Sequence, residues 1–153
     1  MWLSKKQADQ LPTRGAAARA APVARQVTTK SRGDAAEAAA RVWLAKAGLQ
    51  WVESNYRTPG RGGGEIDLVM RDSDGTLVFV EVRQRSKASH GGAGASIGNA
   101  KQQRIIFAAR HYLMRFASPP PCRFDVVLVH GALSEETSPG ADIEWLPAAF
   151  DAS

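Results

Sequence analysis

Apolar and polar residues alternate most regularly between residues 65 and 83. In residues 65–71 (EIDLVMR), isoleucine, leucine and methionine alternate with positions that are mostly charged. Residues 76–83 (TLVFVEVR) are rich in β-branched and aromatic side chains. The intervening residues 72–75 (DSDG) are typical of a tight turn. The pattern therefore predicts a β-hairpin.

Gly75 sets the register of this hairpin. Glycine favours the left-handed conformation that ends a three-residue loop, here residues 73–75. That loop places Asp67 directly opposite Glu81, whereas a two-residue loop would put these carboxylates on opposite faces. The three-residue loop also leaves the other face wholly apolar, and that face consists of Ile66, Leu68, Met70, Val78, Val80 and Val82. We therefore favour the three-residue loop.

The carboxylates of Asp67 and Glu81 are then candidate chemical groups. Directly opposite Cβ atoms lie about 4.5–5.5 Å apart, where like charges destabilise a sheet. A divalent cation between them, Mg²⁺ or Mn²⁺, removes this repulsion, because Mg²⁺ sites use one or two carboxylates and leave other positions to water and phosphate. The alternative is two solvated carboxylates on an open sheet face. The same register indicates a cross-strand ion pair between Glu65 and Arg83.

Helical periodicity predicts two helices, over residues 34–47 and 99–116. Ser31 or Asp34 can cap the first helix, and Gly48 ends it. The expected buried stripes are Ala36, Ala40, Trp43, Leu44 and Ala47 on the first helix, and Ile105, Ala109, Tyr112, Leu113 and Phe116 on the second.

Further strands are predicted at residues 49–57, 123–129 and 143–146, with a final helical turn at residues 147–150. Glycine-rich loops are expected at residues 58–64 and 86–98. The predicted fold class is α/β, with a mixed central β-sheet of four to five strands flanked by helices.

Length and composition fit a single core of ordinary size in this chain of 153 residues. The one cysteine, Cys122, excludes an intramolecular disulfide and a Cys-based zinc cluster. No apolar run approaches membrane-spanning length, and the first residues do not have the pattern of a signal peptide. We expect a cytoplasmic protein without a membrane partner.

Charge and composition divide the chain into an N-terminal extension, residues 1–31, and a domain, residues 32–153. Residues 1–32 contain seven basic residues and one acid, which predicts a disordered extension. It is either a non-specific DNA-contacting arm or a segment without a role. The other 121 residues hold 20 − 7 = 13 basic and 15 − 1 = 14 acidic residues, so the net charge of the whole chain does not by itself indicate nucleic-acid binding.

Within the domain the two signs of charge are segregated. No acid occurs from Val82 to Phe124, and the basic residues there are Arg83, Arg85, Lys87, Lys101, Arg104, Arg110, Arg115 and Arg123. A basic stretch that directly follows the acidic hairpin favours a polyanionic partner. The alternative is a solvated basic helix face.

Asp67, followed fourteen residues later by Glu81-Val82-Arg83, resembles the PD-(D/E)XK nuclease core with arginine at its usual lysine. Together with the segments GEIDL (64–68), FVEVRQR (79–85) and RFDVV (123–127), the pattern resembles the bacterial YraN family. That family is similar to archaeal Holliday-junction resolvases, and the resemblance covers residues 32–150. It implies a restriction-endonuclease-like fold in the domain at residues 32–153.

The resemblance also implies a function. It is that of a divalent-metal-dependent phosphodiesterase or endonuclease on structured or branched DNA, and a homodimer if the chain follows the resolvases. Asp67 and Glu81 would hold Mg²⁺ or Mn²⁺, and Glu37 on the first helix matches a family glutamate that contributes to the metal site. Glu37 lies on the flank of the buried stripe, and its alternative is an i,i+4 ion pair with Arg41.

Basic residues of the family correspond to Lys101 and Arg104, which implies phosphate contacts. A family arginine near the glycine-rich loop corresponds to Arg57 or Arg61, and Arg85 lies in the basic stretch after the hairpin. The last matching strand contains Asp125, whose structural interpretation is an ion pair with Arg123 or Arg110.

Arg83 decides between cleavage and binding. The usual lysine positions or deprotonates the attacking water, and a guanidinium, which stays protonated, cannot deprotonate it. Arg83 could orient phosphate and stabilise the transition state as a member of the catalytic set. The alternative is a non-catalytic nucleic-acid-binding protein that retains the nuclease fold.

Overall fold

The computed structural model describes residues 29–85, 97–131 and 142–152. Its elements are α2 (Thr29–Lys46), β1 (Gln50–Arg57), β2 (Glu65–Arg71), β3 (Leu77–Arg85), α4 (Asn99–Leu113), β4 (Cys122–His130) and β5 (Asp142–Phe150). The expected extension at residues 1–31 and the expected loop at residues 86–98 lie largely outside the described residues. None of the helices in the described ranges is long and apolar enough for a membrane crossing.

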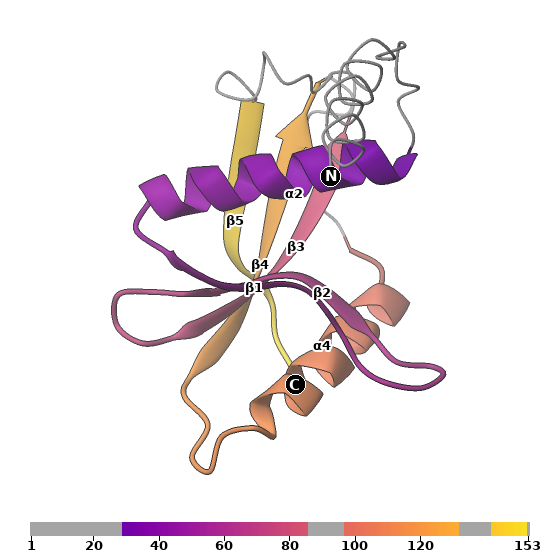
Figure 1. The fold of residues 1–153 in the computed structure, drawn as a ribbon, viewed down its shortest axis with the longest axis vertical. Coiled ribbons are helices and arrows are strands. Elements are labelled where there is room, and N and C mark those ends of the chain that lie inside the picture. Colours follow the sequence, from indigo (N-terminus) through magenta and orange to yellow (C-terminus); the bar gives the residue numbers. More distant parts are fainter. Residues whose placement is uncertain (1–28, 86–96, 132–141, 153) are drawn as a thin grey trace, which may run out of the picture.

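The five strands form one sheet in the order β1-β2-β3-β4-β5 (Figure 1). The β3–β4 pair is parallel, because the chain between them crosses over through α4, and the other three pairs are antiparallel. Helices α2 and α4 pack on opposite faces of this sheet. The predicted α/β fold, with a mixed sheet of four to five strands flanked by helices, is confirmed.

The predicted hairpin is confirmed, including its three-residue loop. The Asp72 N–H donates to the Thr76 carbonyl at 2.8 Å, and Gly75 has a φ of 91°, in the left-handed region. Strand pairing then follows the expected register through Val69–Phe79 and Leu68–Val80.

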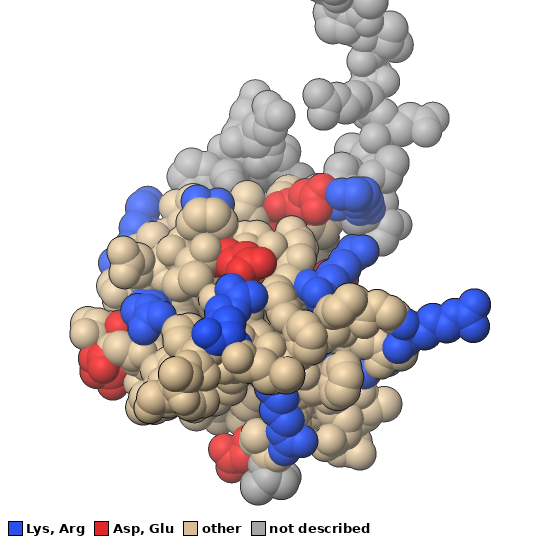
Figure 2. All heavy atoms as spheres, turned by 60° about the horizontal axis from the view of Figure 1, so that its bottom comes forward, with Lys and Arg blue, Asp and Glu red and all other residues tan. Residues whose placement is uncertain are grey.

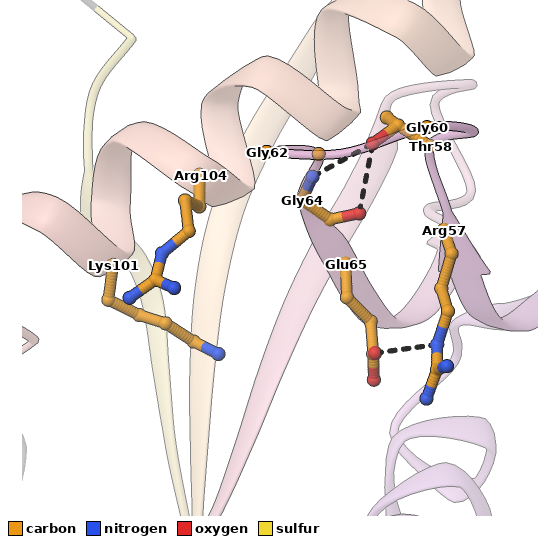
Figure 3. Close-up of a pocket in the computed structure, with 9 residues that line it drawn as sticks. Arg57, Thr58, Gly60, Gly62, Gly64, Glu65, Lys101 and Arg104 are labelled. Carbon is orange, nitrogen blue, oxygen red and sulfur yellow. Dashed lines mark hydrogen bonds and ion pairs between the residues drawn. The ribbon is translucent and has the colours of Figure 1, made fainter.

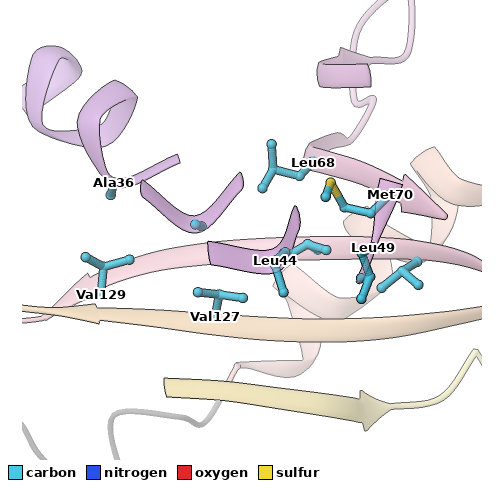
Figure 4. Close-up of a cluster of buried hydrophobic side chains, with 10 residues drawn as sticks. Ala36, Leu44, Leu49, Leu68, Met70, Val127 and Val129 are labelled. Carbon is cyan, nitrogen blue, oxygen red and sulfur yellow. The ribbon is translucent and has the colours of Figure 1, made fainter. Parts of the chain in front are cut away.

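The α2 face of the sheet carries the first apolar cluster (Figure 4). Ala36, Ala40 and Leu44 are buried as expected, but Trp43 and Ala47 are exposed. Trp43 instead packs edge-on against Trp145 of β5 at the rim of the cluster, with ring centroids 5.9 Å apart.

The predicted start of the first helix was wrong, because α2 begins at Thr29. Ser31 and Asp34 therefore lie inside the helix and do not cap it. Its end was predicted correctly: Gly48, with a φ of 109°, follows the last turn, and the Leu49 N–H donates to the Leu44 carbonyl.

The α4 face carries the second apolar cluster. Ile105, Ala109 and Tyr112 are buried as predicted, whereas Leu113 and Phe116 are only partly buried against the cluster. The helix ends at Leu113 rather than at Phe116, because its last turns close through i,i+3 hydrogen bonds.

Gly64, at the start of β2, fixes how closely α4 approaches the sheet. A Cβ atom at this position would lie 1.9 Å from the Arg104 carbonyl oxygen. Only glycine permits this contact, which brings the first two turns of α4 against the loop before β2.

The predicted C-terminal helical turn at residues 147–150 was wrong, because β5 continues to Phe150. The register of β4 and β5 shifts between Phe124 and Val126, and Ala148 there has a φ of 51°. Beyond this irregularity, Phe150 pairs with Phe124, and their rings stack with centroids 4.9 Å apart.

Candidate functional site

Strands β2 and β3 part at Asp67. Their ladder within the described residues ends at Leu68–Val80, one pair before Asp67 and Glu81. The Asp67 Oδ2 atom accepts a hydrogen bond from the Val82 backbone N–H at 2.8 Å. The side chain of Asp67 thus takes up a donor that the ladder would otherwise use, and it lies beside β3 at Glu81.

The same level of the sheet is irregular in β1. Asn55 has a φ of 55° and lies between the pairs Ser54–Leu68 and Tyr56–Ile66, level with Asp67. Ile66 packs in the α4 cluster, whereas Leu68 packs in the α2 cluster. Our expectation that these two side chains share one face was wrong, because regular alternation is interrupted at this level.

Glu81 lies under α4 and not on an open face, and Asp67 beside it is partly buried. Val69 and Phe79, on the α4 side of the same strands, are fully buried, and Glu81 is only 7% exposed. The alternative of two solvated carboxylates is therefore wrong. The Glu81 Oε1 atom is buried and has no hydrogen-bond partner among the described residues.

Burial strongly perturbs both carboxylates. Burial first, and the neighbouring Asp67 second, raise the pKa of Glu81 to about 8, while Lys101 and Arg83 oppose the rise. Burial also raises the pKa of Asp67, against the Val82 N–H, which lowers it. Because the pKa of Glu81 lies above 7, this carboxyl retains a proton at neutral pH.

Lys101 is the cation that approaches this pair from α4. Its Nζ atom lies 3.7 Å from Glu81 Oε2, and its side chain is 45% exposed. The Lys101 side chain therefore extends from the buried Glu81 carboxyl to solvent. Arg83 lies two residues after Glu81 on β3 and lowers the pKa of Glu81 less than Lys101 does.

Glu37 of α2 lies near Asp67. Burial first, and the charge of Asp67 second, raise the pKa of Glu37 to about 7, while a hydrogen bond with the Asn55 side chain lowers it. Glu37 and Asn55 line a hollow of about 350 Å³ on the α2 side. Arg41, the alternative partner of Glu37, places its guanidinium 3.8 Å from the centroid of the Trp51 ring.

On the α4 side lies an open cleft of about 450 Å³ (Figure 3), and Lys101, which approaches Glu81, is one of its lining residues. The cleft is lined by Arg57, Thr58, Gly60, Gly62, Gly63, Gly64, Glu65, Lys101 and Arg104. The loop that forms its wall is closed by Thr58, whose hydroxyl accepts the Gly64 N–H at 2.8 Å. The structure thus brings the predicted phosphate-contacting residues Lys101 and Arg104 to one cleft.

Three further candidate arginines from the sequence lie in different places. Arg57 lines it, and its Nε atom lies 2.8 Å from Glu65 Oε2, so Glu65 pairs with Arg57 rather than with Arg83 as we expected. Arg61 is exposed and is not among the lining residues. Arg85 ends β3, where its Nη1 donates to the Gln84 carbonyl at 3.0 Å.

No three His, Cys, Asp or Glu residues in the described part of the chain are grouped closely enough to hold a metal ion together. The fit is that of a two-carboxylate site: the buried, unpartnered Oε1 of Glu81 and the adjacent Asp67 supply oxygen donors of the type that Mg²⁺ uses with water. Glu37 lies outside this pair and would act on it through water.

Sequence reasoning missed Asn55 and the role of Thr58. Asn55 gives no signal in the alternation, although asparagine is among the residues that best tolerate a positive φ.

Basic side chains on the face shown in Figure 2 are distributed among acidic and neutral ones and do not gather in one patch. On this face, charge alone therefore does not mark a binding site.

Comparison with known proteins identifies the family. A model of "Uncharacterised protein family UPF0102" matches residues 36–129. A UPF0102 protein from Polaromonas naphthalenivorans (strain CJ2) is 76% identical over 153 residues, which cover all of both chains. A UPF0102 protein from Paracidovorax citrulli (strain AAC00-1) is 61% identical over 129 residues, which are 84% of this chain and 89% of that protein. The chain therefore belongs to the UPF0102 family, the YraN family that its motifs resemble.

Proposed function

We propose that this protein is a divalent-metal-dependent phosphodiesterase, an endonuclease that acts on structured or branched DNA. The observation that carries the proposal is the pair of Asp67 and Glu81. Glu81 is buried, Asp67 is partly buried beside it, and the Glu81 Oε1 atom lacks a hydrogen-bond partner in the described residues. A buried carboxylate that retains an unsatisfied oxygen requires an explanation, and a cation is the one that also removes the repulsion between the two acids. The PD-(D/E)XK resemblance supports the same assignment.

Asp67 and Glu81 would hold Mg²⁺ or Mn²⁺, and Glu37 would orient a water bound to it. The ion supplies a Lewis acid and lowers the pKa of bound water. Because Glu81 retains a proton near neutral pH, metal binding would release that proton.

Lys101 supplies the amine that the motif lacks at Arg83. An ammonium has three N–H donors on a flexible stem, so Lys101 is suited to position the attacking water by a hydrogen bond. Its position 3.7 Å from Glu81, in the lining of the cleft, supports this role. Arg83 would stabilise charge on the phosphate, and Arg104 would bind a neighbouring phosphate.

Calorimetric titration with Mg²⁺ and Mn²⁺ tests the metal site. We expect the wild type to bind and to release a proton, and Asp67→Asn to lose binding. Asp74→Asn, which removes a charge from the exposed turn of the same hairpin, is the matched control and should bind as the wild type does. Equal binding by Asp67→Asn, or none by the wild type, would contradict the proposal.

The second candidate is a nucleic-acid-binding protein that does not cleave, and Arg83 in the usual lysine position favours it. Cleavage of four-way junctions, flaps and single strands, with each metal, separates the two candidates. If Lys101 takes part in the reaction, Lys101→Met should lower the cleavage rate by about 100-fold or more when the metal is saturating. Metal binding without metal-dependent products at high protein concentration would leave only the binding function.

A further inference from the structure

The cleft that Lys101 lines has an uneven balance of charge. Its lining contains three cations, Arg57, Lys101 and Arg104, and one acid, Glu65. In Figure 3, Lys101 and Arg104 descend from α4 on one side of the opening, and Arg57 and Glu65 lie on the other. The remaining walls are largely glycine, which leaves room for an extended ligand.

The three cations differ in what they already bind. Lys101 is 3.7 Å from Glu81, and Arg57 is 2.8 Å from Glu65. Arg104 has no acidic partner among the described residues. An anion that enters the cleft therefore meets Arg104 directly, but meets Arg57 only where Glu65 now lies.

The ion pair between Arg57 and Glu65 is weak enough that another anion can replace the Glu65 carboxylate. The side chain of Arg57 is 73% exposed and that of Glu65 is 36% exposed. Ion pairs so open to solvent contribute little to stability, so replacing the carboxylate by another anion costs the fold little. A phosphodiester is a strong replacement, because its two free oxygens accept hydrogen bonds from a guanidinium in the same geometry as a carboxylate.

We propose that Glu65 is a built-in competitor for nucleic-acid phosphate. Its carboxylate occupies the position on Arg57 that a backbone phosphate of a bound strand takes, while Arg104 binds the phosphate next to it. Glu65 thus sets the affinity of the cleft for a nucleic-acid strand. The inference rests on the proposed function only in taking nucleic acid as the ligand, and it requires neither the metal nor cleavage.

The test is DNA affinity in the absence of metal. Anisotropy of a short fluorescein-labelled duplex is measured in EDTA over a range of salt concentrations. We expect Glu65→Gln to bind up to about fivefold tighter, because Arg57 no longer exchanges one anion for another. The plot of log affinity against log salt should steepen by about 0.9, since one more cation pairs with phosphate throughout.

Glu53→Gln is the matched control for charge alone. Glu53 lies on the neighbouring strand β1 and pairs with Arg115 at 3.6 Å, with comparable exposure, but it does not line the cleft. Losing its charge should change affinity only slightly and leave the salt slope unchanged. Arg57→Met should weaken binding, and Glu65→Gln in that background should no longer steepen the slope.

The outcomes separate this inference from the proposed function. If Glu65→Gln matches Glu53→Gln, or keeps its full gain without Arg57, Glu65 is not a competitor. If the wild type binds no DNA at all, the nucleic-acid function itself fails. If calorimetry detects no metal binding but the variants change DNA affinity as expected, the role of Glu65 in the cleft is supported and the metal site is not.

Discussion

Two buried acids on neighbouring strands differ in their hydrogen-bond partners: Asp125 of β4 and Glu81 of β3. Asp125 is fully buried and accepts hydrogen bonds from Arg123 Nε at 3.1 Å, Trp145 Nε1 at 2.9 Å and the Ala148 N–H at 2.9 Å. Glu81 is almost as buried, yet one of its oxygens has no partner in the described residues, and Lys101 stays 3.7 Å away.

The difference separates a structural acid from a functional candidate. The hydrogen bonds of Asp125 offset its desolvation and tie the register shift of β5 to β4, so no ligand is needed to explain it. Glu81 has a raised pKa and an unsatisfied oxygen, and its neighbour Lys101 lines a cleft. Such groups gather at functional sites. Burial alone would not have distinguished the two residues.

The largest expected effect comes from deleting the structural acid. Asp125→Ala should lower the free energy of unfolding by about 3–5 kcal/mol, because it leaves the Trp145 and Ala148 donors unpaired and breaks a buried ion pair. Urea unfolding measures this. Asp72→Ala removes the other carboxylate bound to Arg123, which is partly exposed, and should cost far less. Similar losses for the two variants would contradict the comparison.

The second-largest effect is expected from the titration of Glu81, the functional candidate. The pKa of Glu81 is about 8 in the folded protein and about 4.5 when unfolded. Between these values the native state keeps a proton that the unfolded state has lost. The metal-free protein should therefore lose stability as pH rises from about 4.5 to about 8, by at most about 1.4 kcal/mol per pH unit for this proton.

Glu81→Gln should remove most of this slope and be more stable than the wild type at pH 8. A smaller slope should remain below pH 7, because the pKa of Glu37 is also raised, to about 7. Urea unfolding in EDTA at a series of pH values measures both slopes. Equal pH profiles for the wild type and Glu81→Gln would show that Glu81 carries no perturbed proton.

The hairpin could be predicted from the sequence because its determinants are local. Period-2 alternation gave the bounds of β2, and the preference of Gly75 for positive φ gave the loop and the register as far as Leu68–Val80. The end of the ladder before Asp67 and Glu81 could not be predicted by local reasoning. Level with Asp67 lies Asn55, a residue of the neighbouring strand whose positive φ leaves no mark in the alternation.

The failure at the C-terminus has a similar origin. Residues 147–150, which begin with a proline, were predicted as a helical turn, but β5 is the edge of the sheet, where a strand tolerates proline. The neighbours that make it a strand, Phe124 and Asp125, lie more than twenty residues earlier in the chain.

For the candidate site, residue types were easier to predict than contacts. Asp67, Glu81 and Lys101 were all identified from the sequence, but the approach of Lys101 to Glu81 depends on how α4 docks. That docking is set by the contact of Gly64 with the Arg104 carbonyl, which a one-dimensional pattern does not contain. In the proposed site the amine therefore comes from Lys101 on α4, and not from position 83 on β3.

The smallest effect concerns the acid outside the carboxylate pair. Glu37 and Asp34 lie on the same helix and line the same hollow, but it is Glu37 that is hydrogen-bonded to Asn55, level with Asp67. If Glu37 orients a water on the metal, Glu37→Gln should weaken Mg²⁺ or Mn²⁺ binding by about tenfold, as the loss of an outer partner does, without abolishing it. Asp34→Asn controls for the loss of one negative charge and should change the calorimetric affinity much less. Equal weakening by both variants would reduce the role of Glu37 to its charge, and complete loss of binding in Glu37→Gln would make it a direct ligand together with Asp67 and Glu81.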